Sequence, residues 1–323
     1  MNDELKKAGA PRAIDGRRLL RGITIGTAAA VSSGAPGRAG TGFAAEAAQK
    51  DRAFAVTTVN HLSYASKDYK VTRDFYVSLF GLRDVWDDGT KCQLDCGPED
   101  APNSFYITGA RPGMEATVGH YAFGLPDYWK LTNDLRDELT RREFPGVHPD
   151  GEAGWFVKGP SGYVQHITAV KDLAMFPGAA KPCAVARSDT CKDAYAVGVK
   201  SLDAVPKPDG KGFKALYFSY IVLRVPEVAR EAQFYVSLMG MKPVWQKPED
   251  IGLRFGENTL VIRSSGAERG PSLNEFGFVI ETFDEAKAKA ELARRGIAST
   301  PNPDGGLMIR DPNGLRIGIA GGS

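Results

Sequence analysis

The stretch Phe-Tyr-Val-Ser-Leu-Phe-Gly at residues 75–81 recurs as Phe-Tyr-Val-Ser-Leu-Met-Gly at residues 234–240. Three further blocks repeat in the same order: Val85-Trp86 as Val244-Trp245, residues 139–142 as 292–295, and residues 159–162 as 311–314. Matched blocks in one order indicate a duplicated domain, and such a repeat sets the architecture before any single motif does.

Each copy alternates strand and helix periods in the order βαβββ, and does so twice. The first copy begins with a β-rich run at 56–64, followed by a helix with one apolar stripe that ends at Gly81. The remaining elements of the first copy are expected as strands at 82–86, 91–94, 104–108, 119–124, 155–158 and 163–170, with a helix at 126–143. The predicted fold class is therefore α+β, with tandem βαβββ modules in two domains.

The domain boundaries follow from the repeat. We expect one domain at residues 55–172, a linker at 173–212 and a second domain at 213–321. The 323 residues suffice for two ordinary domains, and 42% hydrophobic with 25% charged residues is typical of globular proteins.

Residues 1–47 indicate an export signal of the twin-arginine kind. Arg17 and Arg18 precede a charge-free run at 22–36, and small residues close the segment at 42–47. Arg21 stands where the twin-arginine motif usually has an apolar residue, so export by another route and a disordered basic tail remain alternatives. Export places the mature chain in the periplasm or outside the cell, with no membrane span.

The charge balance excludes nucleic acid as a partner. The formal net charge is +2, but residues 1–47 hold seven basic and four acidic residues, which leaves 34 basic against 35 acidic in the remainder. A chain without a basic stripe cannot neutralise a row of phosphates. A small-molecule substrate is the expected partner, and homo-oligomer formation stays open.

Four cysteines fit an exported protein, in which an even count indicates disulfides. Cys183 and Cys191 lie in the linker and are the preferred pair, since a bridge there would constrain a segment with little core of its own. Cys92 and Cys96 flank a strand, and no histidine or cysteine partner lies beside them for a metal site.

The order of elements resembles the vicinal oxygen chelate superfamily, which includes glyoxalases, extradiol dioxygenases and bleomycin resistance proteins. The resemblance rests on His61-Leu62-Ser63-Tyr64, the helix end at 75–82, the His-x-x-Phe strand at 120–123 and the Asp-Pro-Asn-Gly turn at 311–314. It covers both domains and implies the fold, but this fold supports many chemistries.

The resemblance also implies a metal site in the first domain. The family's ligand positions fall on His61, on His120 and, four residues after Gly162, on His166, so three of the chain's four histidines coincide with them. The family normally has a carboxylate at the third position, and a one-residue bulge would put Gln165 there instead. His148 is expected at the surface.

Strand alternation supports the first ligand. His61 is expected to share a face with Val59 and Ser63, while Leu62 and Tyr64 point to the other side. In families of this kind the paired modules form a half-open cup around the metal. Trp155 is expected in the core, with a place lining this cup as the alternative.

Neutral imidazoles would leave a formal +2 on a divalent metal, which favours an anionic, chelating substrate oxygen. Fe²⁺ is the preferred metal, with Zn²⁺, Mn²⁺ or Ni²⁺ open. Tyr106 stands where glyoxalase-like members have an acidic ligand, and is a candidate proton donor or simply a half-buried strand residue.

The preferred function is a metal-dependent, dioxygenase-like oxidoreductase acting on a catecholic or enolic substrate. A glyoxalase-like lyase or isomerase with a non-redox metal, and a binding protein of the bleomycin resistance type, are the alternatives.

The second domain is predicted to lack the site. By the repeat, Tyr220, Glu275 and Gly318 replace His61, His120 and His166. Two-domain extradiol dioxygenases usually keep the C-terminal copy active, so the order here is reversed.

Overall fold

The computed structural model describes residues 53–98, 102–144, 148–150, 154–170, 211–266 and 270–322. The expected export segment, most of the linker and the Cys183–Cys191 pair therefore lie outside the described residues. Among the helices described, none has both the length and the apolar character needed to cross a membrane.

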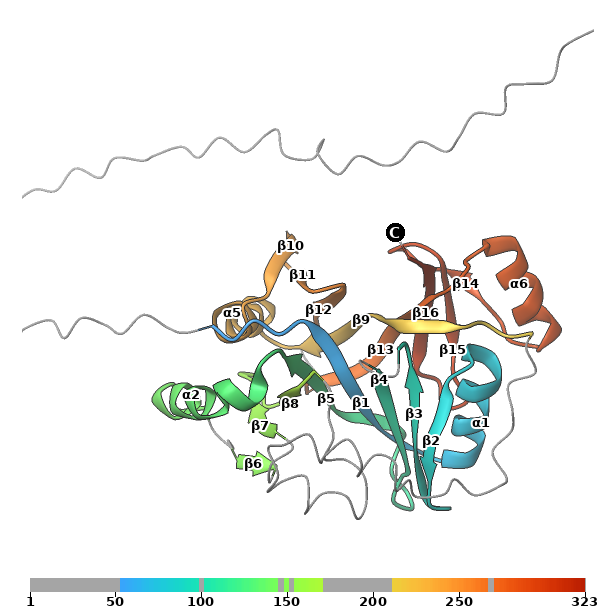
Figure 1. The fold of residues 1–323 in the computed structure, drawn as a ribbon. Helices are drawn as coiled ribbons and strands as arrows, with labels where there is room; N and C mark the ends of the chain where they lie inside the picture. Colours follow the sequence, from blue (N-terminus) through green and yellow to red (C-terminus); the bar gives the residue numbers. More distant parts are fainter. Residues whose placement is uncertain are drawn as a thin grey trace, which may run out of the picture. The chain divides into compact units, whose positions relative to one another are not determined.

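Two eight-stranded mixed sheets form the architecture (Figure 1). The first contains, in spatial order, β2 (Arg83–Asp87), β3 (Lys91–Cys96), β4 (Asn103–Gly109), β1 (Thr58–Ser66), β5 (Thr117–Leu125), β8 (Val164–Ala169), β7 (Gly154–Lys158) and β6 (His148–Asp150). The second contains β10 (Lys242–Lys247), β11 (Asp250–Phe255), β12 (Asn258–Ser264), β9 (Ala215–Val225), β13 (Ser272–Ile280), β16 (Arg316–Gly321), β15 (Leu307–Arg310) and β14 (Thr300–Pro301). The two orders are equivalent strand for strand, as the repeat predicts.

The described residues form four helices beside the sheets: α1 (Tyr69–Phe80), α2 (Tyr128–Arg141), α5 (Val228–Met239) and α6 (Glu285–Arg294). Asp68 caps α1 by accepting hydrogen bonds from the backbone N–H groups of Lys70 and Val71. Gly81 and Gly240 end the repeated helices in the left-handed conformation, both with φ of 64°. The α+β class and the tandem modules are confirmed, and the short edge strands β6 and β14 are additions that the sequence pattern did not indicate.

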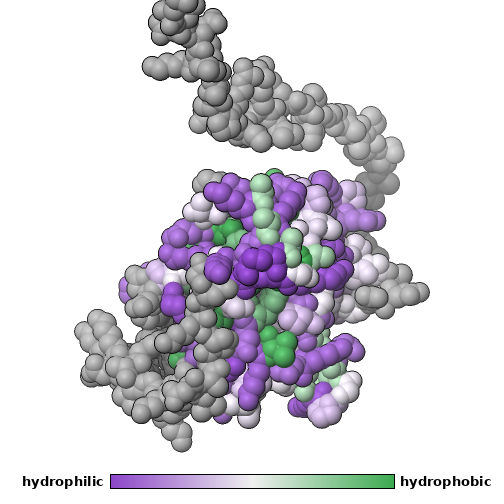
Figure 2. Space-filling view, turned by 90° about the vertical axis from the view of Figure 1, so that its right-hand side faces the viewer, coloured by the Kyte–Doolittle hydropathy of each residue, from purple (hydrophilic) through white to green (hydrophobic). Residues whose placement is uncertain are grey.

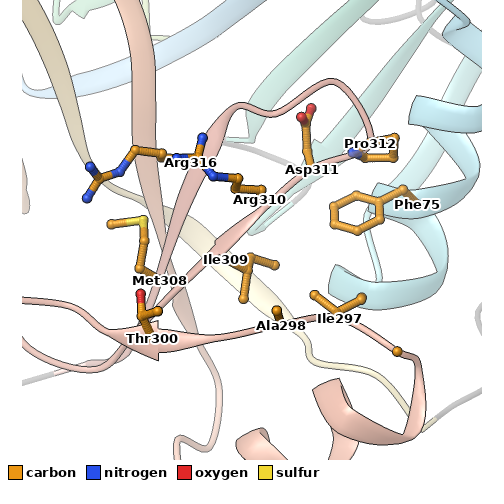
Figure 3. Close-up of a pocket in the computed structure, with 11 residues that line it drawn as sticks. Phe75, Ile297, Ala298, Thr300, Met308, Ile309, Arg310, Asp311, Pro312 and Arg316 are labelled. Atoms are coloured by element: carbon orange, nitrogen blue, oxygen red, sulfur yellow. The ribbon is translucent and has the colours of Figure 1, made fainter.

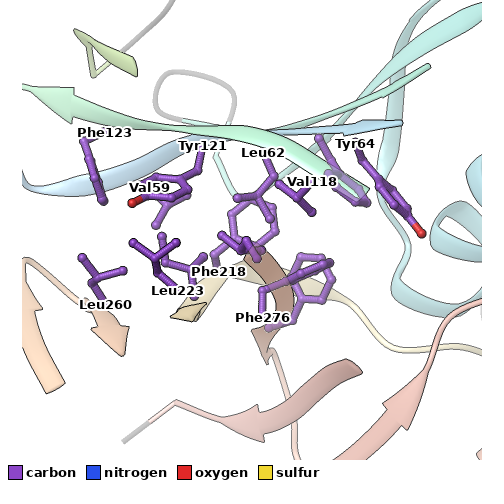
Figure 4. Close-up of a cluster of buried hydrophobic side chains, with 14 of the residues drawn as sticks. Val59, Leu62, Tyr64, Val118, Tyr121, Phe123, Phe218, Leu223, Leu260 and Phe276 are labelled. Atoms are coloured by element: carbon purple, nitrogen blue, oxygen red, sulfur yellow. The ribbon is translucent and has the colours of Figure 1, made fainter. Parts of the chain in front are cut away.

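The apolar core lies between the two sheets. Figure 4 shows Leu62 and Tyr121 of the first sheet pointing toward side chains of the second, such as Phe218 and Leu223. All four are fully buried. Each sheet thus buries one face against the other.

One expectation about β1 is wrong. Val59 was expected on the face of His61, but it is fully buried in the core together with Leu62 (Figure 4). The β1–β5 pairing shifts register between Val59 and His61, so Asn60 is an extra residue. Such a bulge reverses the alternation at one point, and the side chains before it change sides.

Asp311 joins the two halves of the core. Its carboxylate accepts hydrogen bonds from Tyr64 (2.7 Å) and Tyr76 (3.3 Å), which belong to the first domain. It also accepts from the backbone N–H groups of Asn313 and Leu315, and so holds its own turn. Asp311 is 5% exposed, and the bonds from Tyr64, Tyr76 and Leu315 are buried.

Cys92 and Cys96 are buried free thiols. Burial raises the pKa of each thiol well above its usual value. Both thiols therefore act as small apolar core residues rather than as ligands.

Asp311→Ala is expected to lower the free energy of unfolding by about 3 kcal/mol, because it leaves two buried tyrosine hydroxyls and two N–H groups without their acceptor. Urea unfolding followed by far-UV circular dichroism measures the change. Glu249→Ala, an exposed carboxylate, is the control and should change stability by less than about 0.5 kcal/mol. Equal stability of the two variants would contradict the role given to Asp311.

Candidate metal centre

The face of the first sheet that points away from the core carries the polar residues. Residues directly paired across neighbouring strands share a face, so the pairing defines two rows. The first row runs Asp95, Ser104, His61, Ala122, His166 and Phe156. The second runs Gln93, Tyr106, Ser63 and His120.

These rows bring the three predicted histidines together. One nitrogen each of His61, His120 and His166 lies within 4.8 Å of the other two, and no other such group occurs in the part of the chain that the structure describes. The Nε2 atoms of His61 and His120 are 3.2 Å apart. His61 and His166 are fully buried, and His120 is half-buried.

Asn60 fixes the orientation of the His61 ring. Its Nδ2 donates to the carbonyl oxygens of Ala169 (3.0 Å) and Val170 (2.9 Å). The other amide atom, Oδ1, therefore faces His61 Nδ1 at 2.8 Å. An amide oxygen only accepts, so it requires the proton on Nδ1 and leaves the lone pair on Nε2. His61 therefore presents an unprotonated nitrogen toward His120.

Phe156 and Gly154 hold the third histidine. The Phe156 ring stacks on His166, with centroids 4.5 Å apart and an interplanar angle of 14°, and meets the edge of His120 at 5.1 Å. A methyl group on Gly154 would lie 2.2 Å from His166 Nε2, so only glycine leaves room for this ring. An apolar wall and a missing side chain thus set the place of His166.

Burial keeps the imidazoles neutral. Desolvation lowers the pKa of His61 well below its usual value, with further lowering by the charges of His120 and His166. Desolvation also lowers the pKa of His120 to about 4. Neutral imidazole is the form that binds a metal.

The donor set fits a divalent metal ion. Two nitrogens held at about 2.0–2.1 Å from one ion, at angles between square and tetrahedral, lie roughly 2.8–3.4 Å apart, and the separation of His61 and His120 falls within this range. Three imidazoles suit Fe, Zn, Ni and Cu ions. His61, His120 and His166 are therefore the residues that would hold the ion.

The remaining sequence candidates divide between the two faces. Tyr106 lies on the metal face, 8% exposed, with its ring centroid 4.9 Å from that of His61 in an edge-to-face contact. Gln165 lies on the core face and accepts hydrogen bonds from Tyr235 (2.5 Å) and Tyr121 (3.3 Å). Trp155 donates to Thr132 of α2 and so points away from the cup.

In the second sheet, Tyr220 fills the space that the three histidines (the trio) occupy in the first. A methyl group placed on Gly318 would lie 2.3 Å from the Tyr220 hydroxyl, and one placed on Gly277 would lie 2.4 Å from the Tyr220 ring. Glu275, at the position of His120, is 2% exposed and lies 3.3 Å from Arg316 Nε. An ion pair and a tyrosine thus occupy the space that the first domain gives to histidines.

Sequence reasoning missed Asn60, Gly154 and Phe156. The dipeptide Asn60-His61 was visible, but its meaning depends on carbonyls about 110 positions later in the chain. Gly154 and Phe156 act only through strand pairing, and no local pattern marks them.

Residues 217–319 match the family model described as the Glyoxalase/Bleomycin resistance protein/Dioxygenase superfamily. The first sheet has the same strand order as the second, to which this match applies. The second domain therefore belongs to this superfamily. Among curated proteins, no sequence matches the chain.

Solved structures of this superfamily share the two-domain fold. The Mn(II)-bound glyoxalase from Novosphingobium aromaticivorans is 17% identical, with a TM-score of 0.57 and 82% of each chain covered. The 2,3-dioxygenase LapB from Pseudomonas sp. KL28 is 15% identical, with a TM-score of 0.60 and coverage of 84% of this chain and 94% of that one. A catechol 2,3-dioxygenase is 14% identical, with a TM-score of 0.57 and coverage of 83% and 89%.

Asn60→Leu is expected to weaken metal binding about 10- to 100-fold, because nothing then fixes the His61 tautomer. The measurement is the dissociation constant for Zn²⁺ in competition with a chromophoric chelator, with far-UV circular dichroism as a check on folding. Asn302→Leu, which removes a buried asparagine of the second domain, is the matched control and should leave Zn²⁺ affinity unchanged. An unaltered dissociation constant in folded Asn60→Leu would contradict the orienting role.

Proposed function

We propose that this superfamily member is a metal-dependent oxidoreductase of the dioxygenase kind, which acts on a small catecholic or enolic substrate with two neighbouring oxygens. The observation that carries the proposal is the convergence of three histidines, two of them fully buried and one half-buried, on one side of a cup. The two-domain dioxygenases of similar fold support the oxidoreductase class.

The protein's own residues contribute charge balance, orientation and exclusion of water. Three neutral ligands leave the full charge of a divalent ion in place, so the site favours a substrate whose oxygens are, or become, anionic. When bound, Fe²⁺ would supply Lewis acidity and access to one-electron chemistry with O₂. Phe156 shields the histidines on one side, while Ser63 and Tyr106 offer hydroxyl groups from the adjacent row.

Tyr106 is the candidate proton donor. Its ring touches His61, and Ser63 separates it from His120 along the second row. A hydroxyl at this place is able to donate a hydrogen bond to a substrate oxygen beside the three histidines, or to return a proton to a product enolate.

The second candidate is a glyoxalase-like lyase or isomerase. The Mn(II)-bound glyoxalase is similar over 82% of each chain, which favours the same residues working with a non-redox metal. In that case a non-redox ion held by the three histidines would supply Lewis acidity toward a carbonyl, and proton transfer would take the place of oxygenation.

The first test is metal content by mass spectrometry of protein purified without oxygen, together with oxygen uptake over a panel of catechols and enols. We expect about one iron per chain and substrate-dependent oxygen uptake, both lost in His61→Ala and both kept in the control His148→Ala. One zinc, manganese or nickel without oxygen uptake would favour the lyase. Absence of metal after reconstitution would contradict both candidates and leave a binding protein.

Tyr106→Phe is expected to lower kcat by about a hundredfold with little change in KM, since general acid–base groups typically contribute 10²- to 10⁴-fold. Steady-state kinetics on the substrate found in the panel measures this, and metal content shows whether the trio is intact. Tyr163→Phe is the control and should keep kcat, because Tyr163 directly precedes β8 and donates its hydroxyl to the Val118 carbonyl. A variant with normal kcat would make Tyr106 a packing residue.

A further inference from the structure

A separate cavity of about 580 Å³ lies in the second domain (Figure 3). Phe75 of α1 borders it on one side, and Ile297, Met308 and Ile309 line much of the rest. Arg310 and Arg316 reach its upper edge in this view. The volume lies within the range of about 300–1,000 Å³ that is typical of small-molecule sites.

The repeat indicates which residue difference opens this cavity. In the first domain the equivalent place holds Phe144, whose ring meets Phe234 of α5 edge-on with centroids 4.8 Å apart. In the second domain Phe75 is the equivalent of Phe234, and Ile297 replaces Phe144. The shorter aliphatic side chain does not fill the space that a second aromatic ring would, so a hollow remains beside Phe75.

Two arginines give the cavity a cationic end. Arg310 and Arg316 are direct partners across β15 and β16, where like charges disfavour one another unless an anion lies nearby. Arg316 has Glu275 at 3.3 Å from its Nε, which offsets one charge. Arg310 is exposed and donates from Nη1 to the Gly314 carbonyl, which leaves its other donors available.

Asp311 also lines the cavity, but its negative charge is already stabilised by hydrogen-bond donors of the protein. The Asp311 carboxylate is already engaged by Tyr64, Tyr76 and two backbone N–H groups. An entering anion therefore meets a carboxylate stabilised by four donors at one edge and a guanidinium with open donors at the other.

We propose that this cavity is a second binding site, for a small amphiphilic carboxylate with its carboxylate at Arg310 and its apolar body against Phe75 and Ile297. The surface around α1 and α6 argues for a small molecule. Figure 2, which views that side of the molecule, shows only separate apolar patches in a hydrophilic surface. Protein interfaces usually need a larger continuous patch. The site is independent of the metal centre and of the activity proposed for it.

The test is isothermal titration calorimetry of the full chain with decanoate, in metal-free protein and in His61→Ala. We expect one saturable site per chain in both, because the metal centre takes no part. Arg310→Gln should weaken decanoate binding about tenfold or more, since it removes a charge-assisted hydrogen bond. Lys158→Gln, the equivalent position of the first domain, is the matched control and should bind decanoate as the wild type does.

Ile297→Phe copies the aromatic pair of the other half, and should abolish decanoate binding by filling the cavity. Decan-1-ol, with the same body and no charge, should bind about tenfold more weakly than decanoate. The proposal is overturned if decanoate shows no saturable site, if Arg310→Gln binds it normally, or if decan-1-ol binds equally well. Loss of binding in His61→Ala would also overturn it, because the ligand would then lie at the metal centre.

Discussion

The burial of one face of each sheet against the other is the constraint on which the metal face depends. Leu62 and Tyr64 must point into the shared core, so the residues between and before them, His61 and Ser63, must point out. The same alternation on β5 and β8 turns His120 and His166 outward while Tyr121 and Gln165 turn inward. The core thus selects the face on which ligands can gather, and the strand pairing selects which of them meet.

Contacts between a helix of one domain and a turn of the other hold the two sheets in this arrangement. Asn313 donates to Thr72 of α1 at 2.9 Å. At the equivalent place of the other half, the backbone N–H of Ser161 donates to Glu231 of α5, also at 2.9 Å. The carboxylate has changed sides: Asp311 lies on the turn in one half, and Glu231 lies on the helix in the other. A side chain on Gly159, the equivalent of Asp311, would come 2.4 Å from the Glu231 carboxylate. The two substitutions are therefore compatible only together.

The repeat and the family resemblance were enough to predict the βαβββ order, the left-handed glycine at the end of α1 and the positions of His61, His120 and His166. The orientation of Val59 was not predictable, because the bulge at Asn60 follows from pairing with β5 rather than from local sequence. The role of Asn60 likewise depends on the Ala169 and Val170 carbonyls, and the role of Gly154 on the ring of His166. Local patterns reveal which residue types are present, whereas these features depend on contacts between distant parts of the chain.

The second sheet indicates what remains of such a cup when histidines are replaced. A buried Glu275 costs free energy unless it is paired, and Arg316 and Arg263 lie 3.3 Å and 3.8 Å from it. Tyr220 occupies the rest of the space, over Gly277 and Gly318, with Asn302 donating to its hydroxyl at 3.4 Å. Returning a histidine to position 318 alone would therefore clash with Tyr220 rather than create a ligand. The two cups therefore differ through several coupled replacements. The domain that lacks the three histidines contributes one face of the core, the Asp311 contact and most walls of a separate cavity.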